Sequence, residues 1–199
     1  MTKVCIVTGA SRGMGYGIAK VLAKEEGATV YATARSKQAL DDLSASTKDS
    51  LGVIHPCVLD QADDGAVERF VLDVTAKEKQ IDLLVNSAYG GLIAMAPHFG
   101  KPFWERPVSV FDASMNIGLR SAFVMSKFVA PHMVKNKSGL MVQVSSFGGH
   151  GYLFDVGYGV GKAGLDRLSA DMAAELTTHG VSSVTLYPGG AITETANFP

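Results

Sequence analysis

Six short apolar runs alternate with five longer segments of helical periodicity, and this alternation constrains the fold more than any other feature of the 199 residues. The runs lack a polar alternation, so we expect strands that are covered on both faces. They lie at 4–8, 29–33, 52–59, 81–85, 140–144 and 184–187. The helical segments lie at 15–26, 37–45, 63–79, 109–136 and 157–179. The pattern predicts one α/β domain over 1–199, with βαβ units building a doubly wound parallel sheet in the order 3-2-1-4-5-6.

Composition excludes several classes of partner. Lysine and arginine number 18 and aspartate and glutamate 19, so the chain has no electrostatic footprint for nucleic acid or an anionic membrane surface. Its apolar stretches are too short for a spanning helix, and the run after Lys3 is too short for a secretory signal. Cys5 and Cys57 lie in apolar runs, and the histidines show no metal-ligand spacing. We expect an intracellular, cytoplasmic protein without a metal site, and leave peripheral membrane association open.

A glycine-rich turn, TGASRGMG at 8–15, joins the first predicted strand to the first predicted helix. Glycines there permit a tight turn and a close approach of backbone to pyrophosphate, and the helix N-terminus supplies N–H donors and a positive dipole end. A flexible turn would explain the glycines alone, but this location favours phosphate binding. The predicted phosphate-binding residues are Gly9, Ser11, Arg12, Gly13, Met14 and Gly15.

The residues after the second strand bear on the choice of nucleotide. An enzyme that prefers NAD usually has an acidic residue there, about 20 positions after the glycine turn, to bind the ribose diol. This chain has Arg35 at that place and no acid before Asp41. Arg12 and Arg35 could converge on a 2′-phosphate, so the sequence predicts NADP(H). Asp60, after the third strand, has two alternatives: it accepts from the adenine amino group or it caps the next helix.

Tyr158 and Lys162 lie four residues apart in a predicted helix, so both project from one face. A nearby cation favours the phenolate and moves a tyrosine toward a pKa that is useful for proton transfer. Taken alone, the two side chains could be a snorkelling pair on an amphipathic helix. Ser145 and Ser146 end the fifth strand and bring hydroxyls to the same sheet edge. Asn116, inside the predicted 109–136 helix, could hold a water that relays protons.

These residues together resemble the short-chain dehydrogenase/reductase family over essentially the whole chain. The motifs are TGASRGMG at 8–15, NSAYG at 86–90, Asn116, the serines at 145–146, Tyr158 with Lys162, and Pro188-Gly189. The stretches at 103–105, 116–120 and 158–164 point to one subfamily. The resemblance implies a Rossmann fold in which Tyr158 is the general acid and Lys162 lowers its pKa and binds the nicotinamide ribose.

The resemblance assigns further residues to the site. It implies that the serine orients the carbonyl and that Asn116, with a water, completes a proton relay. Asn86 would lie at the wall beside the adenine ribose, and Ala88 in the cofactor site. The nicotinamide carboxamide is assigned to Pro188, Gly189 and Thr193.

The chain departs from the family pattern in four places. The usual spacing to the tyrosine selects Ser145, whereas the position in the serine pair selects Ser146, which we prefer. Tyr89 stands where a glycine is common. The segment 92–107 is predicted to be a long loop whose apolar side chains line a substrate entrance or tuck under the loop itself. The chain stops at Pro199, so we expect it to lack the family's usual C-terminal lid and last strand.

The sequence therefore predicts an NADPH-dependent carbonyl reductase that acts on a ketone or aldehyde of mainly apolar character. By resemblance, the long helices at 109–136 and 157–179 would form the interface of a homodimer or homotetramer. Two alternatives stay open: a noncatalytic NADP(H)-binding sensor or scaffold, and a nucleotide-fold transferase with another adenosine cofactor.

Overall fold

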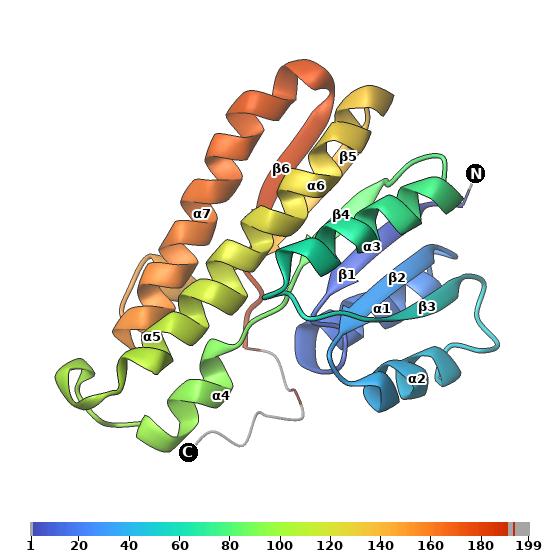
Figure 1. The fold of residues 1–199 in the computed structure, drawn as a ribbon. Helices are drawn as coiled ribbons and strands as arrows, with labels where there is room; N and C mark the ends of the chain where they lie inside the picture. The colour runs from blue at the N-terminus through green and yellow to red at the C-terminus, as the bar shows by residue number, and fades with distance from the viewer. Residues whose placement is uncertain (1, 191–192, 194–199) are drawn as a thin grey trace.

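The computed structural model describes residues 2–190 and 193, and Figure 1 shows its parallel sheet. Within this part of the chain the strand order is β3-β2-β1-β4-β5-β6, which confirms the predicted doubly wound α/β fold. The strands are β1 (Val4–Thr8), β2 (Thr29–Ala34), β3 (Val53–Val58), β4 (Leu83–Asn86), β5 (Gly139–Val144) and β6 (Val181–Leu186). Their ends lie within three residues of the predicted ones. The expectation that the strands are covered on both faces is wrong for β3 and β6, which lie at the sheet edges and expose several of their residues.

Helices pack on both faces of the sheet, as the crossovers predict (Figure 1). The helices α1 (Gly13–Lys24) and α2 (Lys37–Ala45) bury one face, and α3 (Asp64–Lys77), α6 (Ser121–Asn136) and α7 (Val156–Leu176) bury the other. Neighbouring residues of a strand point to opposite faces, so Ile6 joins the core under α3 and α6 while Val7 joins the core under α1 and α2.

The prediction of one continuous helix over 109–136 is wrong. The chain forms α5 (Val108–Ser114), a π-helical turn η3 (Met115–Arg120) and then α6. Ile117 leaves helical geometry, with φ −108° and ψ 64°, and its carbonyl accepts a hydrogen bond from the Gly90 N–H at 2.7 Å. The hydrogen bond that accompanies this break comes from a segment distant in the sequence. The apolar periodicity of 109–136 therefore gives no sign of the break.

The segment 92–107 contains more regular structure than the expected loop. It includes most of α4 (Gly91–Met95) and the short 3₁₀ turns η1 (Ala96–His98) and η2 (Phe103–Glu105). Met95 is buried, whereas Phe103 and Trp104 are 62% and 73% exposed and meet edge to face. These two aromatic side chains therefore do not tuck under the segment.

Two further 3₁₀ turns, η4 (Phe147–Gly149) and η5 (Thr177–His179), flank α7, and the second accounts for the end of the predicted 157–179 helix. Cys5 and Cys57 are free thiols, on strands separated by β2. Among the helices that the structure describes, none has both the length and the apolar character needed to cross a membrane.

Candidate active site

The turn after β1 runs across the carboxyl ends of three strands. The Ala10 N–H donates to the Thr33 carbonyl of β2 at 3.0 Å, and the Thr8 hydroxyl oxygen accepts from the Ala88 N–H, beyond β4, at 3.1 Å. Gly9 has φ +68°, and a Cβ at this position would lie 2.7 Å from the Ala88 Cα. Only glycine fits there, so the turn is held close to the residues that follow β4.

The start of α1 fits a dinucleotide phosphate. Arg12 occupies the N-cap position in an extended conformation, and its side chain makes no capping hydrogen bond. Gly15 packs so closely on the Gly9 carbonyl that no side chain could replace its hydrogen. Gly13, with φ +56°, faces Thr193, whose Cγ2 would lie 3.8 Å from an added Cβ. A long helix whose first turn lacks a side-chain cap can bind an anion through its N–H groups.

Arg12 and Arg35 both have exposed side chains, beyond the carboxyl ends of β1 and β2. The strands are adjacent in the sheet, so both arginines lie at the same edge. Their joint contact with a 2′-phosphate stays a prediction.

The alternative that Asp60 caps the following helix is wrong. Asp60 Oδ1 accepts from the Ala62 N–H at 3.0 Å, in the turn that precedes α3. Asp63 is the N-cap of α3 and accepts from the Ala66 N–H at 2.9 Å. Both aspartates stand before the same helical pattern, and only Asp63 is adjacent to its first turn. The contact of Asp60 with adenine remains a prediction.

Asn86 directs its side chain into the helix layer. Its Nδ2 donates to the Ser126 hydroxyl at 3.0 Å and to the Ala122 carbonyl at 3.4 Å, both on α6. The amide thus connects β4 to α6, on the opposite face of the sheet from α1. The place of Asn86 at the wall beside an adenine ribose stays a prediction.

Tyr158 lies in the first turn of α7, 8% exposed, and the Ser146 side chain lowers the pKa of its phenol. Ser145 donates its hydroxyl to the Lys162 carbonyl at 3.2 Å and is buried. Consecutive side chains alternate in extended backbone, so we expect the two serines to point to different sides. The preference for Ser146 as the serine that orients the carbonyl stays a prediction.

The Lys162 ammonium lies beside the Tyr158 ring in a buried position. Its Nζ donates to the Val144 carbonyl at 2.9 Å and lies 5.6 Å from the centroid of the Tyr158 ring. Burial lowers the pKa of Lys162 to about 8, against the opposing effect of the Asp166 carboxylate. Burial also raises the pKa of Tyr158, against the opposing effect of the Ser146 side chain, so the lowering of this pKa that was expected from Lys162 is not found. Near neutral pH the site thus holds a protonated phenol and a mostly charged amine.

Two aromatic rings meet the Tyr158 ring edge to face. The Tyr89 centroid lies 5.6 Å away and the Phe154 centroid 5.0 Å away, each with an interplanar angle of 87°. Phe154 has φ +63°, which is unusual for a residue with a bulky side chain. Sequence reasoning singled out Tyr89 as a departure from the family pattern but did not place it against Tyr158, and it missed Phe154.

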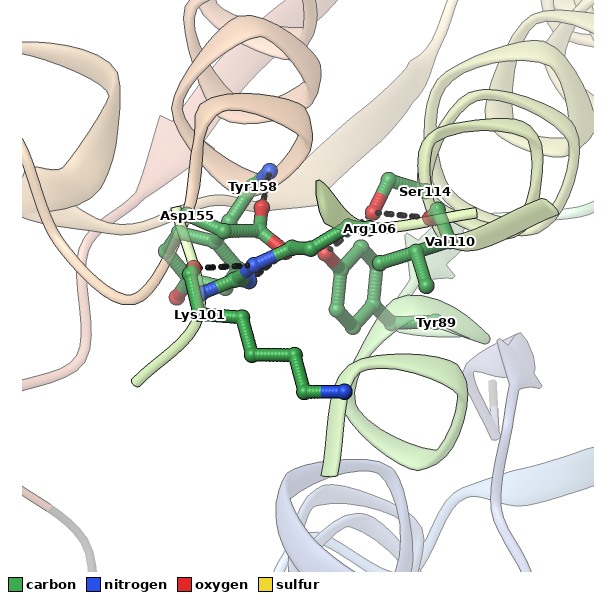
Figure 2. Close-up of polar contacts among 7 residues, drawn as sticks. All are labelled: Tyr89, Lys101, Arg106, Val110, Ser114, Asp155 and Tyr158. Atoms are coloured by element: carbon green, nitrogen blue, oxygen red, sulfur yellow. Dashed lines mark hydrogen bonds and ion pairs between the residues drawn. The ribbon is translucent and has the colours of Figure 1, made fainter. Parts of the chain in front are cut away.

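A buried ion pair supports the first turn of α7 (Figure 2). Asp155 is the N-cap, with Oδ1 accepting from the Tyr158 N–H at 2.6 Å and Oδ2 pairing with Arg106 Nη1 at 2.8 Å. Arg106 Nε donates to the Lys101 carbonyl at 2.8 Å. The pair thus fixes the segment before α5 to the start of α7. An aspartate three residues before Tyr158 could have predicted the cap, whereas nothing in the sequence indicated Arg106 as its partner.

Asn116, whose relay through a water stays a prediction, follows α5 in the chain. It lies in η3 rather than in an α-helix, and its side chain is exposed. Within the described part of the chain, no hydrogen bond joins its amide to Tyr158 or Lys162. Pro188 and Gly189 follow β6 at the carboxyl edge of the sheet, and Thr193 lies near Gly13. Their contact with a carboxamide stays a prediction.

The comparisons with known proteins agree with this arrangement. The profile of the family described as short chain dehydrogenase matches residues 3–198. Dehydrogenase/reductase SDR family member 1 is 46% identical in Mus musculus over 196 residues and 44% identical in Homo sapiens over 194 residues. This is the subfamily to which the stretches at 103–105, 116–120 and 158–164 point. Each alignment covers 96% of the chain and 61% of the relative, so the chain spans about three fifths of their length.

Solved structures share the fold. A metagenomic short-chain oxidoreductase in complex with NADP superposes with a TM-score of 0.84 at 30% identity, covering 95% of this chain and 83% of that one. NAD⁺-bound xylitol dehydrogenase gives 0.85 at 28% identity, covering 94% and 70%. The glycine turn, the sheet order and the tyrosine–lysine helix thus occur together in a chain that matches one family profile almost from end to end, and the protein belongs to the short-chain dehydrogenase family of oxidoreductases.

Proposed function

We propose that this chain binds NADP(H) and reduces the carbonyl group of a ketone or aldehyde of mainly apolar character. One observation carries the proposal: Tyr158 is 8% exposed in the first turn of α7, and the Lys162 ammonium lies 5.6 Å from the centroid of its ring. These groups lie at the carboxyl edge of the sheet, where the glycine turn also lies. A family member needs both parts at one edge to bring a nicotinamide cofactor to a substrate.

The residues that would hold the cofactor come from several loops at this edge. The turn at 9–15 would bind the pyrophosphate, Arg12 and Arg35 the 2′-phosphate, and Asp60 the adenine amino group. The carboxamide would lie against Pro188, Gly189 and Thr193. When bound, the reduced nicotinamide supplies the hydride. One similar structure holds NADP and another NAD⁺, so the proposed preference for NADP(H) rests on the two arginines.

The three site residues would divide the proton chemistry between them. Ser146 donates a hydrogen bond to the carbonyl oxygen and orients it. Tyr158 gives its phenolic proton to that oxygen as the carbonyl carbon is reduced, which leaves an alcohol and a phenolate. Lys162 stabilises this phenolate by its positive charge. The raised pKa of Tyr158 supports the role of acid, because the phenol stays protonated until a substrate accepts its proton.

The surroundings of Tyr158 favour an apolar substrate. Phe154 meets the phenol edge to face, and Phe99 from the 92–107 segment lies behind it with a centroid distance of 6.4 Å. Phe147 and Tyr152, on the loop that follows Ser146, have largely exposed rings. Aromatic side chains close to Tyr158 and on the loop before α7 would bind an apolar carbon skeleton better than a polar one.

NADPH consumption by the full protein that carries these residues tests the proposal. The substrates to be tested are steroids, quinones, aromatic ketones and oxoacyl thioesters. The loss of NADPH absorbance measures the rate with each substrate. We expect turnover of at least one apolar carbonyl class, and we expect Tyr158→Phe to lower kcat by about two to four orders of magnitude with NADPH affinity nearly unchanged. Full activity in that variant would remove Tyr158 as the acid. NADPH binding without turnover would select the sensor or scaffold, and failure to bind NADPH would favour the transferase.

We also propose that two or four copies associate through α6 and α7. Three exposed apolar side chains lie on these helices: Phe123 on α6, and Val156 and Val160 on α7. Burying them between copies would remove this surface from water. Light scattering that gives a monomer would contradict the proposal. The free thiols of Cys5 and Cys57 support a reducing compartment such as the cytoplasm.

A further inference from the structure

We infer that Tyr89 is a positioning residue whose ring face holds the Lys162 ammonium beside Tyr158. This inference deepens the proposed function and rests on it for its catalytic meaning. Its structural content is a contact between one aromatic ring and one buried cation, and this contact can be tested without any substrate.

The geometry places the ammonium against two rings. Lys162 Nζ lies 4.8 Å from the centroid of the Tyr89 ring and 5.6 Å from that of Tyr158. The two rings are perpendicular, with their centroids 5.6 Å apart. A cation over an aromatic face within about 6 Å is attracted by the electron-rich face of the ring. The shorter of the two contacts is with Tyr89.

The position of the Tyr89 ring is fixed from three sides. Its hydroxyl hydrogen-bonds to the Ser114 Oγ of α5 at 2.9 Å, as Figure 2 shows. A Cβ at Gly118 would lie 3.0 Å from the ring, and a Cβ at Gly91 would collide with the hydroxyl. Glycines therefore make room for the ring on two neighbouring segments. A tyrosine at this position is part of the packing and not a surface side chain that happens to lie near Lys162.

Tyr89 offers this contact as a neutral ring. Burial raises its pKa well above the ordinary value, against the effect of the hydrogen bond to Ser114, so the phenol does not ionise near neutral pH. Among the residues that the structure describes, the other groups that act on the ammonium are the Val144 carbonyl, the Tyr158 ring and the Asp166 carboxylate. An ammonium in so buried a place loses its hydration, and an aromatic face replaces part of it.

Nuclear magnetic resonance of the protein with ¹³Cε-labelled lysine tests the contact, because the Cε shift follows the protonation of each amine. A Lys162→Met variant assigns the Lys162 signal. Tyr89→Leu removes the aromatic face and keeps an apolar side chain, whereas the matched control Tyr89→Phe keeps the ring and loses only the hydroxyl. We expect Tyr89→Leu to lower the midpoint of the Lys162 titration by about one pH unit and Tyr89→Phe to leave it nearly unchanged.

Lys127 provides an internal reference, since its ammonium lies 4.9 Å from the centroid of Phe128 on α6 and none of the variants touches that ring. Its titration should be the same in all samples. A Lys162 midpoint that is unchanged or raised in Tyr89→Leu, or lowered equally in both variants, would overturn the inference.

The enzyme assay separates this inference from the proposed function. If the protein is active, kcat plotted against pH should begin to change at a lower basic pH in Tyr89→Leu than in the wild-type protein. In Tyr89→Phe the basic limb of this profile should lie at the wild-type position. If the wild-type protein turns over no carbonyl, the proposed function fails, while the titration still decides whether Tyr89 holds Lys162. If turnover is present but the Lys162 titration ignores the ring, only the inference fails.

Discussion

Arg106 and Asp155 form an ion pair at 2.8 Å, with both side chains more than nine-tenths buried. The pair joins segments 49 residues apart in sequence and lies directly behind the backbone N–H of Tyr158. Two charges in such a place are costly to desolvate, and each is tolerated because the other is present. Asp155 also caps α7, so this pair connects the stability of the fold to the position of the proposed acid.

Removing one partner should cost more than removing both charges. Arg106→Met leaves the Asp155 carboxylate buried without its cation, and we expect a loss of about 3–5 kcal/mol in the free energy of unfolding. Adding Asp155→Asn removes the remaining charge and keeps an acceptor for the Tyr158 N–H, so the double variant should be the more stable of the two. Denaturant unfolding measures both. A double variant that loses the sum of the single losses would show that the two side chains act independently.

Alanine substitutions at Ser146 and Ser145 should affect different properties of the protein. Ser146→Ala removes the hydroxyl that lowers the pKa of the Tyr158 phenol and that is proposed to orient the carbonyl, so we expect kcat to fall by about two orders of magnitude or more with little change in NADPH affinity. Ser145→Ala removes only the hydrogen bond to the Lys162 carbonyl, so it should cost about 1 kcal/mol of stability and leave most of the activity. Steady-state kinetics and unfolding of both variants make the comparison. The reverse ranking would select Ser145 as the substrate-binding serine.

Arg35→Asp should reverse the nucleotide preference. The substitution removes a cation from the end of β2 and supplies an acid that can accept from a ribose diol. We expect NADPH affinity to fall by about 10- to 100-fold and NADH affinity to rise. Fluorescence titration gives both dissociation constants. Lys37→Asp, also exposed but two residues further on at the start of α2, is the matched control for a general change of charge. An unchanged ratio in Arg35→Asp would refute the assignment.

Lys162 should make stability rise with pH in a defined window. Its folded pKa of about 8 lies below its ordinary value of 10.5, so between these values the unfolded chain binds more protons than the native one. The cost of burying the cation is therefore fully present below pH 8 and is relieved as the pH rises toward 10.5. Compared with Lys162→Met, the wild-type protein should gain about 3 kcal/mol of relative stability across this window. Unfolding curves at several pH values test this, and parallel pH dependences would contradict it.

The fold could be predicted from local patterns, because the inner strands are short apolar runs and most of the long helices have their own periodicity. The break at Ile117 could not, since its cause is a bond to Gly90, 27 residues earlier. The same limit applies to the site. Tyr158 and Lys162 are neighbours on one helix and could be paired from spacing, whereas the Tyr89 ring reaches Lys162 only through the folded chain.

At Phe154 the conformational energy of the backbone and the position of the ring beside Tyr158 favour different residues. A bulky residue at φ +63° raises the energy of the native backbone by about 1–3 kcal/mol, and here that residue is the one whose ring borders the reactive phenol. A glycine would relieve the torsion and delete the wall. The stability of the backbone and the shape of the surface beside the proposed acid therefore make opposite demands on this one position.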